Sequence, residues 1–138
     1  MPVTLKSIKV GDELPRREHE ASNVSLFLYN AAVWNPHRIH YDDVYAREQE
    51  GYSALVIDGP LQGDWLCQAV TNWLGGDGEL LSFSYSNRLA AYLGETLTSG
   101  GRIAGVDPDS GRVELDLYIE NETGEVTTPG RATVVLAP

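Results

Sequence analysis

The chain has 138 residues, with 20 Asp and Glu against 10 Lys and Arg, so its formal net charge is −10. This charge argues against nucleic acid and against an anionic membrane surface as partners, because both would repel an acidic protein. Hydrophobic residues make up 42% of the chain, which is enough for a core, and we expect one domain over residues 1–138. Cys67 is the single cysteine, which excludes a disulfide framework and a cysteine-based zinc site.

No apolar run approaches the roughly 18 residues that a membrane span requires. The first 20 residues contain no apolar stretch of the signal-peptide type. We therefore expect a soluble, cytoplasmic protein whose small-molecule site is built from little chain.

The first elements along the chain are a weak strand and a helix. Residues 14–20 are a strand candidate, although Pro15 and the charges weaken the signal. Ser22 is typical of an N-cap, and the helix that it starts must end before Pro36. Helical spacing predicts one buried apolar stripe on this helix, formed by Val24, Phe27, Leu28, Ala31 and Ala32.

Two further helices are predicted, a short one and a long one. Asp42 caps a short helix over residues 43–50, and Gly51 ends it. Gly59-Pro60 opens a longer helix to Leu74, since proline is tolerated in a first turn. The long helix has a broad apolar face, and its polar residues are expected off that face: Gln62, Asp64, Gln68 and Asn72.

Everything after Asp77 is predicted to be strand. The candidates are residues 80–85, 97–106, 112–120 and 131–136, with turns at 107–111 and 121–124. Residues 112–120 alternate apolar and polar, which predicts a sheet with one buried face. Helices followed by consecutive strands indicate an α+β domain, with the apolar helix packed on one face of an antiparallel sheet.

Three groups of residues are candidates for chemistry. His37 and His40 lie in an irregular loop, where function often concentrates, although they could simply hydrogen-bond loop backbone. No second histidine pair has ligand spacing, so we expect no metal and no cofactor. The free amides of Gly59 and Leu61 at the start of the long helix can receive a negative oxygen, although Asp58 could merely cap that helix.

Arginines are the third group. An anionic ligand on so acidic a protein requires a local basic cluster, but each arginine could equally be a solvated surface charge. The candidates are Arg38, Arg47, Arg88 and Arg102.

Several motifs together resemble those of one family. They are Asn35-Pro36-His37-Arg38-Ile39-His40-Tyr41-Asp42, Tyr45-Ala46-Arg47, Glu50-Gly51-Tyr52, Asp58-Gly59-Pro60-Leu61, Phe83-Ser84-Tyr85-Ser86-Asn87-Arg88 and Leu93-Gly94-Glu95-Thr96-Leu97. The chain resembles the MaoC-like hydratase/dehydratase family over residues 5–136. Within that family it most resembles the branch that includes the mitochondrial 3-hydroxyacyl-thioester dehydratases and the itaconyl- and mesaconyl-CoA hydratases. Among these motifs, the one from Asn35 to Asp42 is specific to the family.

The resemblance implies a fold and a reaction. The fold is the hot dog fold, an antiparallel sheet wrapped around a long central helix. The reaction is reversible addition of water to a 2-enoyl thioester of coenzyme A or acyl carrier protein, without a cofactor. The site is expected near a dimer interface, in a homodimer, a higher oligomer or a heterodimer with another hot dog subunit.

The resemblance also implies roles for individual residues. His40 matches the family's proton-transfer histidine, and the amide of Gly59 matches the oxyanion donor. Asn35 stands where the family has an aspartate, and its amide can orient the water but cannot take a proton from it. His40 must therefore perform both proton steps unless Asp42 or a partner supplies an acid. Asp58 stands where the family usually has histidine, and its carboxylate would oppose charge developing beside Gly59.

The expected substrate-binding residues are Arg38, His37, Asp58, Leu61 and Arg88, with a positive mouth formed by Arg38, Arg88 or Arg102. Two alternatives remain open. One is a non-catalytic or half-site subunit of a heteromeric hot dog dehydratase, and the other is an acyl thioesterase.

Overall fold

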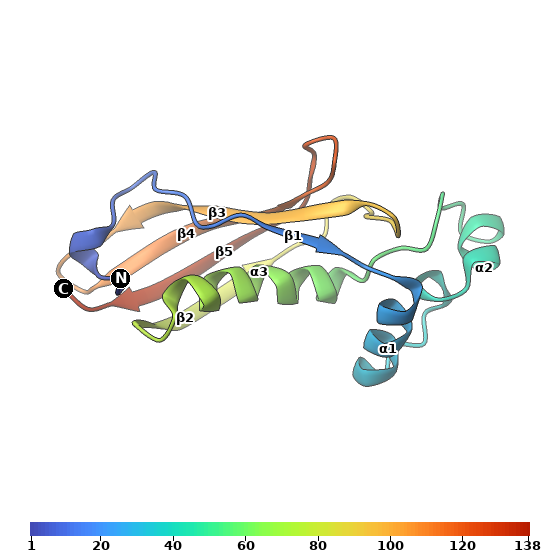
Figure 1. Ribbon diagram of the computed structural model, residues 1–138, viewed down its shortest axis with the longest axis horizontal. Helices are drawn as coiled ribbons and strands as arrows, with labels where there is room; N and C mark the ends of the chain where they lie inside the picture. Colours follow the sequence, from blue (N-terminus) through green and yellow to red (C-terminus); the bar gives the residue numbers. More distant parts are fainter.

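A computed structural model describes residues 1–138 and contains a five-stranded antiparallel sheet with one long helix along its face (Figure 1). The strands lie in the order β1-β3-β4-β5-β2. Their bounds are Arg17–Glu20 for β1, Gly78–Tyr85 for β2, Thr96–Val106 for β3, Arg112–Glu120 for β4 and Val126–Leu136 for β5. The long helix is α3, Gly59–Leu74. The α+β class is confirmed, and the arrangement is that of a hot dog fold.

The helix α3 begins and ends where the sequence predicts. Pro60 occupies its first turn, and Gly75 ends it with a left-handed φ of 56°. The face turned to the sheet includes Leu66 and Val70, neither of which has exposed surface. Gln62 is also buried, although it was predicted to lie off the apolar face.

The core side of the sheet comes from alternation along its strands. On β4 the residues predicted to share one face are all buried: Val113, Leu115, Leu117 and Ile119. Strand β5 begins at Val126, five residues before the predicted start. Pro129 lies within the strand, and its carbonyl accepts a hydrogen bond of 3.0 Å from the backbone N–H of Ser86.

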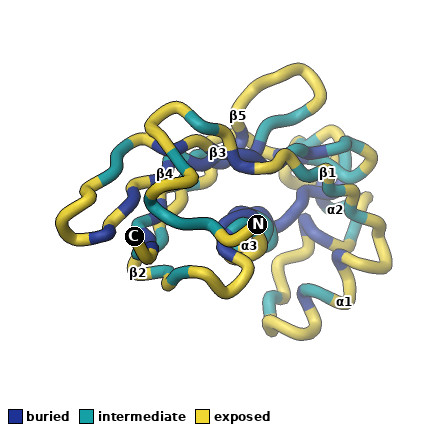
Figure 2. Tube along the Cα trace, turned by 60° about the vertical axis from the view of Figure 1, so that its left-hand side comes forward, coloured by how far each residue is buried: buried dark blue, intermediate teal, exposed yellow.

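The predicted buried stripe of α1 (Asn23–Val33) is wrong. Ser22 caps the helix as expected, since its side chain accepts from the N–H of Ser25 at 3.0 Å. The predicted stripe is exposed: the solvent-exposed fraction is 62% for Val24, 59% for Phe27 and 61% for Leu28. The helix projects beyond the end of the sheet, so only a narrow line of residues on it is covered (Figures 1 and 2). That line is formed by Leu26 and Asn30.

The remaining elements are short. Strand β1 covers only residues 17–20 of the predicted 14–20 and pairs with β3 at one sheet edge. Two 3-10 turns are η1 (Leu5–Ser7) and η2 (Arg38–His40). The predicted short helix is α2, Asp43–Glu48, and Asp42 caps it. None of the helices has the length and hydropathy that a membrane crossing requires.

The contrast between α3 and α1 gives a stability prediction. Leu66→Ala is expected to lower the free energy of unfolding by about 2–5 kcal/mol, because it opens a cavity at a fully buried position. Leu28→Ala, the same change on the exposed face of α1, is expected to cost less than about 1 kcal/mol. Urea unfolding measures both variants. Equal losses would contradict the assignment of α1 as a peripheral helix.

Candidate active site

His40 ends the turn η2 and is held with one ring nitrogen committed. Only 6% of the residue is exposed, and Nδ1 lies 2.7 Å from the carbonyl oxygen of Val56. Because a carbonyl oxygen can only accept, Nδ1 carries a hydrogen and donates it. The other nitrogen, Nε2, is thereby left to exchange protons.

Asp58 precedes α3 but does not cap it. Its side chain makes no capping hydrogen bond, and the residue has no exposed surface. Oδ1 accepts from Nδ2 of Asn30 at 2.9 Å, and Oδ2 accepts from Nδ2 of Asn35 at 3.3 Å. Oδ2 also lies 3.5 Å from Nε2 of His40. The carboxylate is thus turned into the interior, toward three polar side chains and away from the first amides of α3.

Gly59 and His40 line the same cavity, whose volume is about 320 Å³. The N–H of Gly59 donates no hydrogen bond within the chain, because it is the first residue of α3. Pro60 follows and has no N–H. The first residue of a 16-residue helix, with an unpaired amide at the positive end of the helix, therefore lines the same cavity as His40.

A second wall of the cavity is built from amide side chains that sequence reasoning missed. Gln62 Oε1 lies 2.9 Å from the hydroxyls of both Thr127 and Thr128. The Thr128 hydroxyl also lies 3.0 Å from Oδ1 of Asn87. The only sequence signal was a glutamine one turn into an apolar helix, and nothing local indicated its partners on β5.

Asp42 and Arg38 are occupied with each other outside this cavity. Asp42 Oδ2 accepts from Arg38 Nη2 at 2.8 Å, and Oδ1 accepts from the N–H of Tyr45 at 3.1 Å. The hydrogen bond from Arg38 holds the pKa of the Asp42 carboxyl below its usual value. The Arg38 guanidinium lies over the Tyr45 ring at 4.3 Å. Asp42 therefore anchors the loop and α2 and does not line the cavity with His40.

The other predicted binding residues divide between cavity and surface. His37 has an exposed side chain, with Nε2 3.9 Å from Oε1 of Glu50. Leu61 packs against the core and does not line the cavity. Arg102 lines a different surface hollow. Arg88 does line the cavity, which makes it the one candidate of the positive mouth that reaches it.

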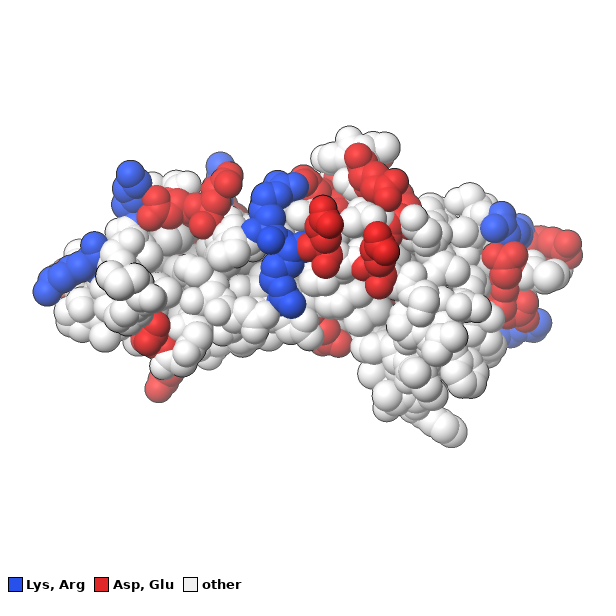
Figure 3. All heavy atoms as spheres, in the orientation of Figure 1, with Lys and Arg blue, Asp and Glu red and all other residues white.

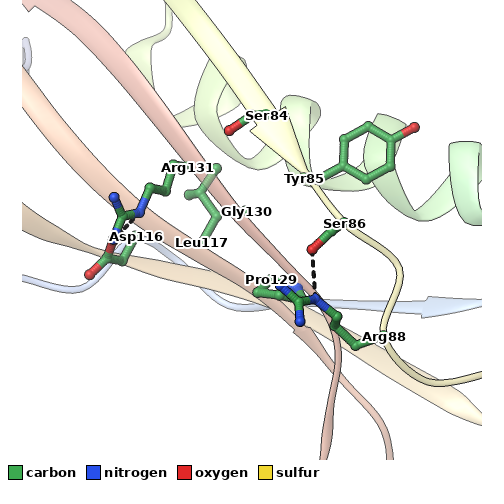
Figure 4. A pocket seen from close by; sticks show the side chains of 9 residues that line it. All are labelled: Ser84, Tyr85, Ser86, Arg88, Asp116, Leu117, Pro129, Gly130 and Arg131. Atoms are coloured by element: carbon green, nitrogen blue, oxygen red, sulfur yellow. Dashed lines mark hydrogen bonds and ion pairs between the residues drawn. The ribbon is translucent and has the colours of Figure 1, made fainter.

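Arg88 also borders a second hollow of about 500 Å³ on the outer face of the sheet (Figure 4). Its Nε donates to the hydroxyl of Ser86 at 2.9 Å. Arg131 lies in the same hollow, with Nε 3.7 Å from Oδ1 of Asp116. On the face shown in Figure 3, basic groups form a narrow column flanked by acidic groups, with no broad basic patch.

The side chains around the cavity do not form a metal-binding site. No group of three or more His, Cys, Asp or Glu side chains is placed to hold a metal ion. The arrangement offers instead a buried imidazole, a helix amide and an arginine around one cavity. It can transfer a proton and stabilise a negative oxygen.

Comparison with known proteins points to one family. Residues 5–93 match the family model for hydroxyacyl-thioester dehydratase type 2. A mesaconyl-C(4)-CoA hydratase of Chloroflexus aurantiacus is 56% identical over 36 residues, which are 26% of this chain and 13% of that protein. The mitochondrial hydroxyacyl-thioester dehydratase type 2 of Saccharomyces cerevisiae is 27% identical over 97 residues, covering 69% of this chain and 34% of that protein. The chain spans about half the length of these relatives.

Solved structures support the fold. An (R)-hydratase from A. caviae involved in PHA biosynthesis superposes with a TM-score of 0.85 at 20% identity, over 95% of this chain and 98% of that chain. At this identity the similarity establishes the hot dog fold.

The close approach of Gly59 and Asn87 gives a testable coupling. A Cβ on Gly59 would overlap the side-chain amide nitrogen of Asn87 and lie 2.7 Å from its Cγ. Gly59→Ala is therefore expected to lower the free energy of unfolding by about 1–3 kcal/mol. In an Asn87→Ala background the same change is expected to cost less than about 1 kcal/mol, because the obstructing amide is gone. Thermal unfolding of the four proteins checks this, and an equal cost in both backgrounds would contradict it.

Proposed function

We propose that this chain, which belongs to the hydroxyacyl-thioester dehydratase type 2 family, adds water reversibly to a 2-enoyl thioester to give a 3-hydroxyacyl thioester. One observation carries the proposal: His40 and the unpaired amide of Gly59 line the same cavity of about 320 Å³. Because the chain covers only part of its curated relatives, its own activity and substrate rest on this geometry.

The two groups match the two requirements of the reaction. As water adds to the β-carbon, the π electrons move toward the thioester carbonyl, whose oxygen becomes negative. The N–H of Gly59 at the positive end of α3 stabilises that oxygen. His40 takes the proton that water loses and returns it to the α-carbon. Asp58 does not oppose the charge at Gly59, because its carboxylate is turned toward Asn35 and His40.

Removing the imidazole tests the role of His40. His40→Ala is expected to lower kcat for hydration of crotonyl-CoA by at least about 100-fold, since general acid–base catalysis contributes factors of that order. Loss of the enoyl absorbance measures the rate, and circular dichroism checks the fold. His37→Ala removes an imidazole that does not line the cavity and is expected to retain most of the activity. Unchanged turnover in His40→Ala would overturn the assignment.

We also propose that the acyl group arrives on a phosphate-bearing carrier, coenzyme A or the phosphopantetheine of an acyl carrier protein. Arg88 lines the cavity and the outer hollow that Arg131 shares, so its guanidinium lies between the reacting centre and the surface. A carrier phosphate in that hollow would meet two arginines and the hydroxyl of Ser86. This local cluster offsets the net charge of −10 where an anionic substrate must approach.

The carrier proposal predicts a selective change in KM. Arg88→Gln is expected to raise the KM for crotonyl-CoA by about tenfold, the value of one lost charge-assisted hydrogen bond. The KM for the crotonyl thioester of N-acetylcysteamine, which lacks the phosphates, is expected to change less than about twofold. Arg112→Gln, an exposed strand position outside both hollows, is the matched control. Equal increases for both substrates would show that Arg88 does not bind the phosphate.

We propose further that the working unit contains a second hot dog subunit, either another copy or a different chain. One observation supports this: β2 is the last strand of the sheet and pairs with β5 alone, which leaves its other edge free. A half-site subunit would be inactive by itself and gain hydration activity with its partner. A thioesterase would release free thiol from the same substrate, so following enoyl absorbance and thiol together separates the three cases.

A further inference from the structure

We infer that Asp58 is the carboxylate partner of His40, acting through the imidazole from the start of α3. Asp58 replaces the acid that the family resemblance places at position 35. The inference deepens the proposed hydration and depends on it for its kinetic test. It starts from a carboxylate with no exposed surface, whose Oδ2 lies 3.5 Å from Nε2 of His40.

His40 is the only ionisable side chain placed to balance the negative charge of Asp58. A buried carboxylate is costly unless it is hydrogen-bonded or paired with a cation. Asn30 and Asn35 donate hydrogen bonds to it but are neutral. No lysine or arginine lies within ion-pair distance, and His40 is the one ionisable group that does. A proton on Nε2 of His40 is therefore stabilised directly by Asp58.

Nε2 is also the nitrogen that is free to exchange a proton. Nδ1 donates to the carbonyl of Val56 at 2.7 Å, which fixes both the ring orientation and the tautomer. Any further proton on His40 must arrive at Nε2, on the side of Asp58. The pair is thus arranged to favour the imidazolium for as long as the proton remains there.

This arrangement lets one histidine perform both proton steps. In hydration an O–H bond of water breaks as the new C–O bond forms at the β-carbon, and the released proton moves to Nε2 of His40. The electron pair of the double bond moves to the enolate. Nε2 then gives the same proton to the α-carbon, and His40 and Asp58 return to their starting state. Asp58 stabilises the imidazolium between the two transfers and keeps its own charge throughout. It differs from a triad aspartate in lying beside the nitrogen that transfers the proton, while the Val56 carbonyl binds Nδ1.

The role of Asn35 changes accordingly. Its Nδ2 lies 3.3 Å from Oδ2 of Asp58, so its amide holds the carboxylate and is not the acid. An aspartate at 35 would place two carboxylates side by side in the interior, where like charges repel. Amide and carboxylate therefore form one hydrogen-bonded pair, in which the carboxylate stands at position 58, where the family usually has histidine, and not at position 35.

Exchanging the two residues provides the test. Asp58→Asn is expected to lower kcat at least about 100-fold with KM within about threefold, because the imidazolium loses its carboxylate partner. The double variant Asn35→Asp/Asp58→Asn restores a carboxylate beside His40 and is expected to regain at least tenfold over the single variant. Asp64→Asn, an exposed carboxylate on the same helix, is the control and is expected to stay within twofold of the wild type.

Each outcome separates this inference from the proposed function. If His40→Ala abolishes hydration while folded Asp58→Asn stays within threefold of the wild type, the inference is overturned and the proposed function stands. A folded double variant with no recovery also overturns it. If the wild-type chain does not hydrate enoyl thioesters, nitrogen-15 NMR of the His40 ring decides. The Nε2 resonance is expected to move in Asp58→Asn and to stay in place in Asp64→Asn, and an unchanged Nε2 resonance in Asp58→Asn overturns the pairing.

Discussion

A carboxylate without exposed surface, at the start of the helix along the sheet, sets the arrangement of the whole active end of the molecule. The buried charge of Asp58 requires hydrogen-bond donors or a cation. These come from two separate segments: Asn30 from α1, and Asn35 and His40 from the loop that follows it. The loop is thereby tied to the N-terminus of α3, which brings the imidazole to the cavity that Gly59 lines. The same constraint explains why α1 stays attached although most of its apolar residues are exposed.

The direction of the Asp58 side chain also decides whether α3 can stabilise an anion. An aspartate that capped the helix would hold a negative charge at the helix end, where the proposed reaction makes the thioester oxygen negative. The Asp58 side chain makes no capping bond, and Gly59, as the first residue of the helix, has an unpaired N–H. The cost of burying the charge is met by Asn30, Asn35 and His40, and the result is a helix end available to a ligand. The Asp58 carboxylate is thus buried among its own partners, while the neighbouring N–H of Gly59 is free to bind a ligand.

Local signals in the sequence were sufficient for most of the helices and strands, and a family motif was sufficient for His40 and Gly59, but neither indicated the amide side chains that form the second wall of the cavity. Pro60 and Gly75 mark the ends of α3 through their own backbone preferences, and the alternation on β4 shows which face is buried. His40 and Gly59 could be named because they belong to a specific motif. The exposed stripe of α1 could not be foreseen, since spacing shows amphipathicity but not whether a sheet reaches that far. The partners of Asp58 and Gln62 lie at least 18 residues away in sequence, so no short-range pattern records them.

Although the chain is acidic overall, its arginines differ in whether a neighbouring carboxylate pairs with them. Asp42 and Asp43 each pair with an arginine four residues away on the sequence, which uses Arg38 and Arg47 in anchoring the loop and α2. Arg88 has no carboxylate partner and is bonded only through the Ser86 hydroxyl, so its charge is available to a ligand at the cavity. What matters for an anionic substrate is therefore which arginine remains unpaired at the entrance. The net charge of −10 makes the protein repel anions as a whole, but Arg88 beside the cavity provides a positive potential where an anionic substrate would bind.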